Sequence, residues 1–461
     1  MDTPLPKPSF NPNKHLKEQF VSNLTGSSLF EIVALTVTIP ILVLIRHSFT
    51  SVPINGDSLK KKNDDPPSEH RSFKAHLATL TLDFLVIVVP MLLFFTVLAD
   101  WSYIFASLFT IVTLLYIAVK RPGGSSPDLG EPNSVRAYIT SYRVIVSCAS
   151  WLLISRIFPR RYAKTETYGA SLMDLGVGAF VLANSLVSRQ ARNVASVNWK
   201  TAIVSSSPLI FLGFFRLVTT TGVDYQVHLA EYGVHWNFFF TLAAISILTS
   251  VINIPPQYSG VFGSLVLVGY QFCLMHGLNH YLLSNERGTD IISQNKEGIF
   301  SIFGYWGMYL IGVQIGNYLL FGSHSTAFKS SRCFRMRVWV LSILFWLLTV
   351  LLDRLVERTS RRTCNLPYVT MVLADNLQLL SILTLADLIP GSKTSVLEEA
   401  FNRNLLATFL LANLLTGLVN LSVDTLSASS TTSVFILLVY AYILSTVIGI
   451  ADYFDIKLKF W

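Results

Sequence analysis

Residues 158–184 read FPRRYAKTETYGASLMDLGVGAFVLAN, and the rest of the chain has to be arranged around this stretch. Its first third is basic, with Arg160, Arg161 and Lys164 close together. The apolar segment that follows contains small residues at roughly helical spacing, which let neighbouring membrane helices approach closely. Asp174 lies one turn inside that segment, where a carboxylate is costly unless it faces a protein interior or a wet cavity. We therefore expect a charged rim that leads into a polar crevice inside a bundle of helices.

Apolar runs surround this stretch on both sides along the chain. The composition is 52% hydrophobic and only 13% charged, whereas a soluble protein is about one quarter charged. Runs of about 17 to 22 apolar residues recur, each long enough to cross a bilayer core of about 30 Å. This pattern predicts an all-α fold, a polytopic bundle of about 13 transmembrane helices. The spans are expected near residues 29–45, 79–98, 101–119, 141–158, 170–187, 201–218, 236–254, 258–277, 299–320, 337–353, 366–386, 404–422 and 433–450.

The formal net charge of +8 fits a membrane protein without a nucleic-acid partner, because short cytosolic loops of such proteins are rich in lysine and arginine. An odd number of spans places the two termini on opposite sides of the membrane. The distribution of Lys and Arg among the loops then predicts a lumenal N-terminus and a cytosolic C-terminus. On this topology the rim at 158–169 faces the lumen, as do the loops near 219–235, 278–298 and 354–365.

We expect one transmembrane domain over residues 29–450, with a lumenal tail at 1–28 and a cytosolic tail at 451–461. Two hydrophilic segments inside it, 46–78 and 120–137, have the composition of loosely ordered linkers. The four cysteines are scattered, without metal-ligand spacing or the density of a disulfide framework. They are interpreted as ordinary core or lipid-facing thiols.

The segment DYQVHLAEYGVHWNFF carries histidines on both sides of a glutamate. If a helix already begins near Tyr225, then His228, Glu231 and His235 share one face. The intervals do not match HExxH and no further ligand is identifiable, so no metal is predicted. Two other interpretations stay open. One is an aromatic-rich helix entry at the membrane interface, and the other is a polar wall of an active site, with His235 as a proton carrier or hydrogen-bond donor.

Other polar residues lie at or inside apolar segments. Arg143 and Arg216 are of this kind, and arginines in such places usually pair with a carboxylate or bind a phosphate. Asp375, Asn376 and Gln378 interrupt the eleventh expected span. Together these residues predict a polar chamber inside the bundle.

At the expected lumenal mouth of the ninth span lie Asn295, Lys296 and Glu297. They either cap the helix and reach back to the interface or belong to a substrate site. No GxSxG, HxxxxD or Walker-type motif is present, so the nucleophile chemistry of soluble hydrolases is not supported.

Several long motifs resemble one enzyme family. The segments are FPRRYAKTETYGASLMDLGVGAF, EYGVHWNFFFTL, NKEGIFSIFGYWG and TCNLPYV, with YITSYRV before them. They resemble the glycosylphosphatidylinositol-anchor inositol acyltransferases, the PIG-W family, and the resemblance covers essentially the whole chain. It implies a multi-pass enzyme of the endoplasmic reticulum membrane. Such an enzyme transfers a fatty acyl group, typically palmitoyl, from acyl-CoA to the inositol 2-hydroxyl of glucosaminyl-phosphatidylinositol, with acyl-CoA as co-substrate and no other cofactor.

The resemblance also suggests roles for individual residues. Lys164 matches the lysine of the family's FPRR-(F/Y)-AK motif, and we assign it the oxyanion or phosphate role. Acid–base chemistry is assigned to candidates that can carry a proton. These are Asp174, Glu231 and His235. Substrate contacts are assigned to the remaining charged and polar residues of the motifs: Arg143, Arg160, Arg161, Glu166, Asn237, Lys296 and Glu297.

One position departs from the family pattern. Members usually carry an aspartate some ten residues before the motif lysine, and Ile154 stands there in this chain. If that aspartate is the family's base, then this chain is catalytically impaired, or is an unusual splice product or a mispredicted sequence, or another acid substitutes for it. The candidates for substitution are Asp174, Glu166 and Glu231. A different hypothesis is a secondary transporter for an organic anion, since many spans and a polar midplane would also suit transport.

Overall fold

The computed structural model describes residues 22, 24–50, 72–119, 132–148, 157–194, 199–222, 229–321, 331–389, 394–424 and 427–457. Within these residues the fold is all-α, and β-structure is limited to one isolated bridge between Ser27 and Ala170. This confirms the expected fold class. The α-helices are α2 (Leu29–Thr50), α3 (Phe73–Asp83), α4 (Val89–Phe95), α5 (Ser102–Val119), α6 (Pro132–Cys148), α7 (Leu172–Leu186), α8 (Trp199–Gly222), α9 (Leu229–Tyr232), α10 (Phe238–Ile252), α11 (Pro256–Cys273), α12 (Asn279–Leu283), α13 (Ile291–Gln294), α14 (Lys296–Gly316), α15 (Ser331–Leu355), α16 (Leu366–Leu383), α17 (Val396–Arg403), α18 (Leu405–Ser422) and α19 (Ser430–Tyr453).

Ten stretches among the described residues are long and apolar enough to cross a membrane, so the count of 13 is not confirmed. Two of the other expected spans are the apolar helices α7 and α10, each with 15 residues. At 1.5 Å per residue such a helix covers about 22 Å, which is short of a bilayer core of about 30 Å. Of the span expected at 141–158, residues 141–148 belong to α6, which begins earlier, at Pro132, and residues 149–156 lie outside the described residues.

The hydrophilic segments are shorter than the sequence suggested. Helix α2 continues to Thr50, and α3 already begins at Phe73, so both ends of the expected linker at 46–78 are helical. Arg46 lies buried in the bundle with its Nε 2.6 Å from Oδ1 of Asp83, and this pairing extends the ordered helix beyond the apolar run. Likewise α6 includes the end of the segment 120–137.

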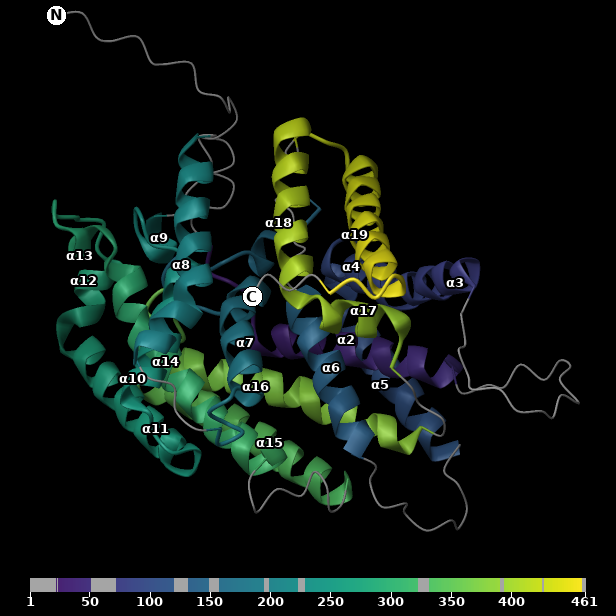
Figure 1. The fold of residues 1–461 in the computed structure, drawn as a ribbon, viewed down its shortest axis with the longest axis horizontal. Helices are drawn as coiled ribbons and strands as arrows, with labels where there is room; N and C mark the ends of the chain where they lie inside the picture. The colour runs from purple at the N-terminus through teal and green to yellow at the C-terminus, as the bar shows by residue number, and fades with distance from the viewer. Residues whose placement is uncertain are drawn as a thin grey trace, which may run out of the picture.

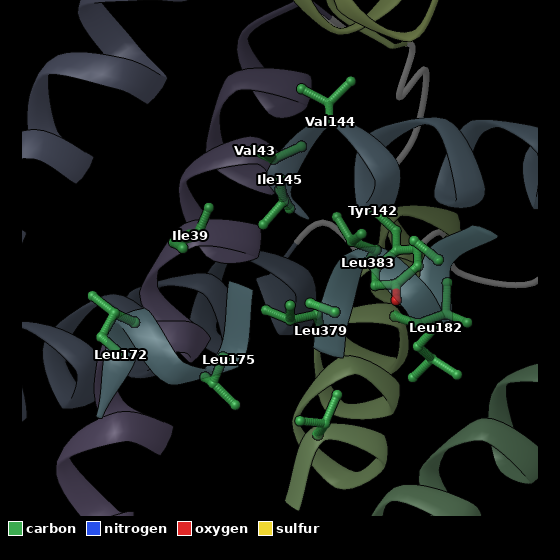
Figure 2. Close-up of a cluster of buried hydrophobic side chains, with 14 of the residues drawn as sticks. Ile39, Val43, Tyr142, Val144, Ile145, Leu172, Leu175, Leu182, Leu379 and Leu383 are labelled. Carbon is green, nitrogen blue, oxygen red and sulfur yellow. The ribbon is translucent and has the colours of Figure 1, made fainter. Parts of the chain in front are cut away.

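Helix α16 is the centre of the bundle, and Figure 1 shows it between α15 and α2. Its side chains are buried nearly all round, because neighbouring helices enclose it. Figure 2 shows Tyr142 of α6, Leu182 of α7 and Leu383 of α16 packed together in the core. These contacts place α16 directly beside the helices that carry the sequence motifs.

The polar residues Asp375, Asn376 and Gln378 do not interrupt this helix, contrary to the sequence-based expectation, since α16 runs unbroken through them. Neighbouring helices satisfy the side chains of Asn376 and Gln378, whereas Oδ1 of Asp375 is buried without a hydrogen-bond partner among the described residues. Asn376 accepts a hydrogen bond from the Tyr142 hydroxyl at 2.9 Å, and Gln378 accepts one from the Trp346 indole at 2.9 Å. A polar residue that finds such partners is compatible with a buried helix.

Glycines allow α14 to pack closely against α7. A methyl group at Gly316 would overlap the backbone carbonyl of Leu186. We expect Gly316→Ala to destabilise the protein by about 1 to 3 kcal/mol, because backbone cannot move aside as a side chain can. Thermal unfolding in detergent measures the effect.

Gly417 of α18 is the matched control, because nothing lies within 4 Å of a methyl group there. Gly417→Ala is expected to be neutral or slightly stabilising, since alanine favours helix by about 1 kcal/mol over glycine. Equal stability of the two variants would contradict the close packing of α14 on α7.

Candidate active site

The loops that carry the motifs meet at one end of the bundle. Backbone hydrogen bonds join Ser27 to Ala170 and Gly169 to Thr359, each at 2.8 Å. A third, at 3.0 Å, joins Val234 to Gln294. The loops expected on the lumenal side therefore lie together. Which side of a membrane they face stays a prediction.

Lys164 lies at this end and pairs with Glu231. Its Nζ is 2.6 Å from Oε1 of Glu231, and the two side chains are 35% and 16% exposed. Lys164 comes from the loop before α7, and Glu231 from the short helix α9. Lys164 and Glu231, which were both expected to be catalytic, are thus in contact although they are far apart in the sequence.

Arg361 connects this pair to Asp174, and sequence reasoning missed it. Its Nε is 2.8 Å from Oδ1 of Asp174, and its Nη1 is 3.5 Å from Oε1 of Glu231. The side chain is only 4% exposed, in the loop between α15 and α16. One signal was available, because two adjacent arginines in ERTSRRTCN stand between apolar runs. Buried arginines require acidic partners.

Asp174 fastens the charged rim to the start of α7. The hydroxyls of Ser171 and Thr165 each donate to Oδ2 at 2.9 Å, and Arg361 donates to Oδ1. Ser171 is also the N-cap of α7 and accepts from the Asp174 amide. These partners hold both oxygens of the Asp174 carboxyl group in place. It is fully enclosed, so the geometry gives it a positioning role.

The charge of Glu231 is fixed by its neighbours. Burial alone raises the pKa of this carboxyl, but the positive charges of Lys164 and Arg361 outweigh burial and lower the pKa to about 2. The stabilisation is therefore present above the ordinary pKa of glutamate and is lost only as the pH falls towards about 2. A carboxylate held this way is a weak base near neutral pH.

The arginines of the rim make structural contacts. Arg161 pairs with Glu31 at 2.8 Å and with Asp100 at 2.6 Å, which ties the rim to the start of α2 and the segment before α5. Arg160 is exposed and donates to the Ser22 carbonyl at 3.1 Å. Both arginines are thus near Lys164 but have protein partners.

Glu166 is half-buried two residues after Lys164. Its backbone N–H donates to the Leu24 carbonyl at 3.2 Å. No hydrogen bond or ion pair to a described residue occupies its carboxylate. It therefore differs from Asp174 and Glu231, which are both held by cations.

His235 and Asn237 lie in the segment that leads from α9 to α10. The His235 side chain is exposed, and its backbone N–H donates to Oδ1 of Asn295 at 2.7 Å. Asn237 is the N-cap of α10 and also donates to the Gly213 carbonyl at 2.9 Å. These contacts order the segment that carries Glu231.

Lys296 and Glu297 form a second cluster. The Lys296 ammonium donates to the carbonyls of Tyr281, Ser284 and Glu286 at 2.7 to 2.9 Å. Glu297 pairs with Arg287 at 2.7 Å and with Arg362 at 3.0 Å. The structure therefore places them in the support of the loop before α13 and α14, separate from Lys164.

Arg143 is not brought to the rim. It lies in α6 and donates to Oδ1 of Asn402 in α17 at 3.4 Å. No cluster of His, Cys, Asp and Glu suited to a metal occurs among the described residues. His228 and Ile154 lie outside the described residues, so the expectations for them stay predictions.

The fold and site define a multi-pass membrane protein with a buried ionic cluster at one end of its helix bundle. The family model described as GWT1 matches residues 13–451, and the chain belongs to the GWT1 family. This confirms the resemblance read from the motifs.

Curated relatives match over nearly their whole length. An uncharacterised protein of Arabidopsis thaliana is 55% identical, over 91% of this chain and 98% of its own. The phosphatidylinositol-glycan biosynthesis class W protein of Dictyostelium discoideum is 34% identical, over 97% of this chain and 99% of its own. The mouse glucosaminyl-phosphatidylinositol-acyltransferase PIGW is 30% identical, also over 97% and 99%.

Proposed function

We propose that this chain transfers a fatty acyl group from acyl-CoA to the inositol 2-hydroxyl of glucosaminyl-phosphatidylinositol during anchor synthesis. The observation that carries the proposal is that Glu231 pairs both with Lys164, the family's motif lysine, and with Arg361. The name of the mouse relative supports the acceptor lipid. The alternative of an anion transporter gains no support from the named relatives.

The reaction makes two demands on the protein. The inositol oxygen attacks the thioester carbonyl, so that a C–O bond forms and negative charge develops on the carbonyl oxygen. The C–S bond then breaks, and the hydroxyl proton passes through a base to the CoA thiolate. A donor must stabilise the oxyanion, and a base must hold the proton in transit.

Lys164 supplies the donor. An ammonium has three N–H groups, and Glu231 occupies one of them at 2.6 Å. The side chain is partly exposed, unlike those of Asp174 and Arg361. Glu231 and Arg361 therefore position Lys164, which directs its other N–H groups to the oxyanion.

Glu166 supplies the base of this chain. Asp174 is enclosed by donors, and Glu231 has a pKa of about 2. Glu166 is the half-buried carboxylate of the rim that no described cation holds. Glu166 can therefore receive the hydroxyl proton without displacing a described cation.

The setting is the endoplasmic reticulum membrane, with the site at the lumenal face and the C-terminus in the cytosol. The exposed apolar side chains of the spans support a multi-pass position in the bilayer. A palmitoyl chain suits such surroundings, since each buried CH₂ contributes about 0.8 kcal/mol.

Microsomes from cells without their own inositol acyltransferase test the proposal. We would supply glucosaminyl-phosphatidylinositol and labelled palmitoyl-CoA to this chain and to Ile154→Asp, and we expect inositol-acylated lipid from both. Glu166→Gln should then lower the rate by about 100-fold in this chain, the usual contribution of a positioned base, and much less when combined with Ile154→Asp.

The possible outcomes test the acyl-transfer function and the role of Glu166 as the base separately. Product from Ile154→Asp alone would mean intact substrate sites and a disabled chain. Equal effects of Glu166→Gln in both backgrounds would remove Glu166 as the base. No product from either well-expressed protein would overturn the proposed function.

A further inference from the structure

We propose that Glu357, in the loop that follows α15, binds the ammonium group of the glucosamine on the acceptor lipid. This inference rests on the proposed function and names a residue that recognises one chemical group of its substrate. The ligand is a primary ammonium, carried by a sugar that is bonded to the inositol. Glu357 would thereby select the lipid with a free amine over the same lipid with an N-acetylated amine.

Four neutral side chains hold the carboxylate of Glu357. The amides of the buried residues Gln271 and Asn365 donate to Oε2 at 2.6 and 3.2 Å. The hydroxyl of Tyr168 and the amide of Asn279, both half-buried, donate to Oε1 at 2.9 and 3.2 Å. The donors come from four separate segments of the chain, so the carboxylate has a fixed position. Its Oε1 lies on the side that is partly open to solvent.

Glu357 differs in its partners from other carboxylates at this end of the bundle. Asp174, Glu231 and Glu297 are each paired with a lysine or an arginine. Among the described residues no cation forms an ion pair with Glu357, including its chain neighbour Arg358. Taking a charge partly out of water is costly when its partners are all neutral. A neutral glutamine would fasten the same segments at lower cost, so the charge indicates a cationic ligand.

The carboxylate lies close to the ionic cluster of the site. Tyr168 follows Lys164 by four residues on the rim, and its hydroxyl bonds to Glu357. Glu357 in turn precedes Arg361, a partner of Glu231, by four residues. Four residues of chain span at most about 14 Å. Because the sugar is bonded to the inositol, one linked pair of rings can place its hydroxyl at Lys164 and its amine at Glu357.

An ammonium fits at Oε1 in the place of the Asn279 amide. The hydrogen bonds of that amide to Glu357 and to the Tyr168 hydroxyl are long, at 3.2 and 3.4 Å. An ammonium has three N–H groups, so it can donate to both of these oxygens. Its bond to the carboxylate is charge-assisted, which makes it stronger than the bond of a neutral amide. An N-acetylated amine has one N–H group and no charge, and it therefore gains less at this position.

Binding to the purified full-length protein in detergent tests the inference without requiring turnover. The probes are radiolabelled glucosaminyl-phosphatidylinositol and its N-acetylated form, which has the same rings and the same phosphate. We expect Glu357→Gln to raise the Kd for the amine by about 10- to 100-fold, the usual value of a hydrogen bond to a charged group. The Kd for the N-acetylated lipid should not change. Glutamine keeps the shape of the side chain, and the Tyr168 hydroxyl can accept a hydrogen bond from its amide.

Asp353 provides the matched control, because it is a second carboxylate near the end of α15. Its Oδ1 accepts from the backbone N–H and from the hydroxyl of Thr359, each at 2.7 Å. Asp353→Asn should leave both Kd values unchanged. An equal effect of Asp353→Asn and Glu357→Gln would mean that the amine responds to the general negative charge of this segment, and it would overturn the assignment to Glu357.

Three further results would also overturn the inference. The first is an unchanged Kd for the amine in Glu357→Gln. The second is an equal loss for both lipids, which would mean that Glu357 acts through the fold. The third is displacement of the probe by phosphatidylethanolamine at equal concentration, since that lipid carries an ammonium without the sugar.

The acyl-transfer assay separates this failure from that of the proposed function. Glu357 contacts a group that does not react, so Glu357→Gln should raise the KM for glucosaminyl-phosphatidylinositol and leave kcat little changed. Product formation with an unchanged KM would leave the function in place and reject the role of Glu357. Absence of product from the unmodified chain, together with a Glu357-dependent preference for the amine, would reject the acyltransferase and retain a site for an aminosugar lipid.

Discussion

Replacing Lys164 with methionine is expected to lower kcat for inositol acylation by about 100- to 1000-fold, as the loss of one oxyanion donor does in acyl-transfer enzymes. The lysine acts on charge that develops in the transition state, so the KM for the lipid should change little. Glu231 keeps Arg361 as a partner at 3.5 Å, and the loop is therefore expected to stay folded. The measurement is the rate of labelled palmitoyl transfer in microsomes that lack their own enzyme.

Arg160 provides the matched control, because it lies on the same rim, is exposed and donates to the Ser22 carbonyl. Arg160→Met should reduce the rate far less than Lys164→Met does. If both substitutions had the same effect, then the rim would act through its general positive charge. If Lys164→Met raised only KM, then the lysine would bind substrate and would not serve the transition state.

Replacing Arg361 with methionine should destabilise the fold by about 3 to 5 kcal/mol, the usual cost of stranding a buried charge. Arg361 is enclosed, and its loss leaves the buried carboxyl group of Asp174 without its cation and Glu231 with Lys164 alone. Burial by itself lowers the pKa of Arg361, but the two carboxylates raise it above the ordinary value of arginine. The guanidinium is therefore always charged in the folded state. Denaturant titration of the purified protein in detergent measures the change.

Two further variants test the cause. Arg358 lies three residues earlier in the same loop and is exposed, so Arg358→Met should change stability by less than about 0.5 kcal/mol. Asp174→Asn combined with Arg361→Met removes the stranded charge and should recover part of the loss. A double variant no more stable than Arg361→Met would show that the charge of Asp174 is not the source of the effect.

The sequence predicted the membrane class and the helical fold because these depend on local properties. The length of an apolar run and the positions of Lys and Arg are readable without knowing what packs where. The same local reasoning was wrong about α16, whose polar residues Asn376 and Gln378 bond to Tyr142 and Trp346 from other helices. A run of residues does not reveal such partners.

The motifs also located Lys164, Glu231 and Asp174 as residues of interest, but each one separately. Their relation depends on Arg361, which comes from a loop that is close to none of them in sequence. The next residue, Arg362, pairs with Glu297 instead. The sequence alone does not show that Arg361 pairs with Asp174 while its neighbour Arg362 pairs with Glu297.

The sequence by itself determined that this chain crosses a membrane as a helical bundle with a charged rim at Lys164. Only the tertiary structure decided which charges share one site and which support a loop. The physical reason is that burial makes each charge require a partner, whereas the packing of the helices determines which partner is within reach.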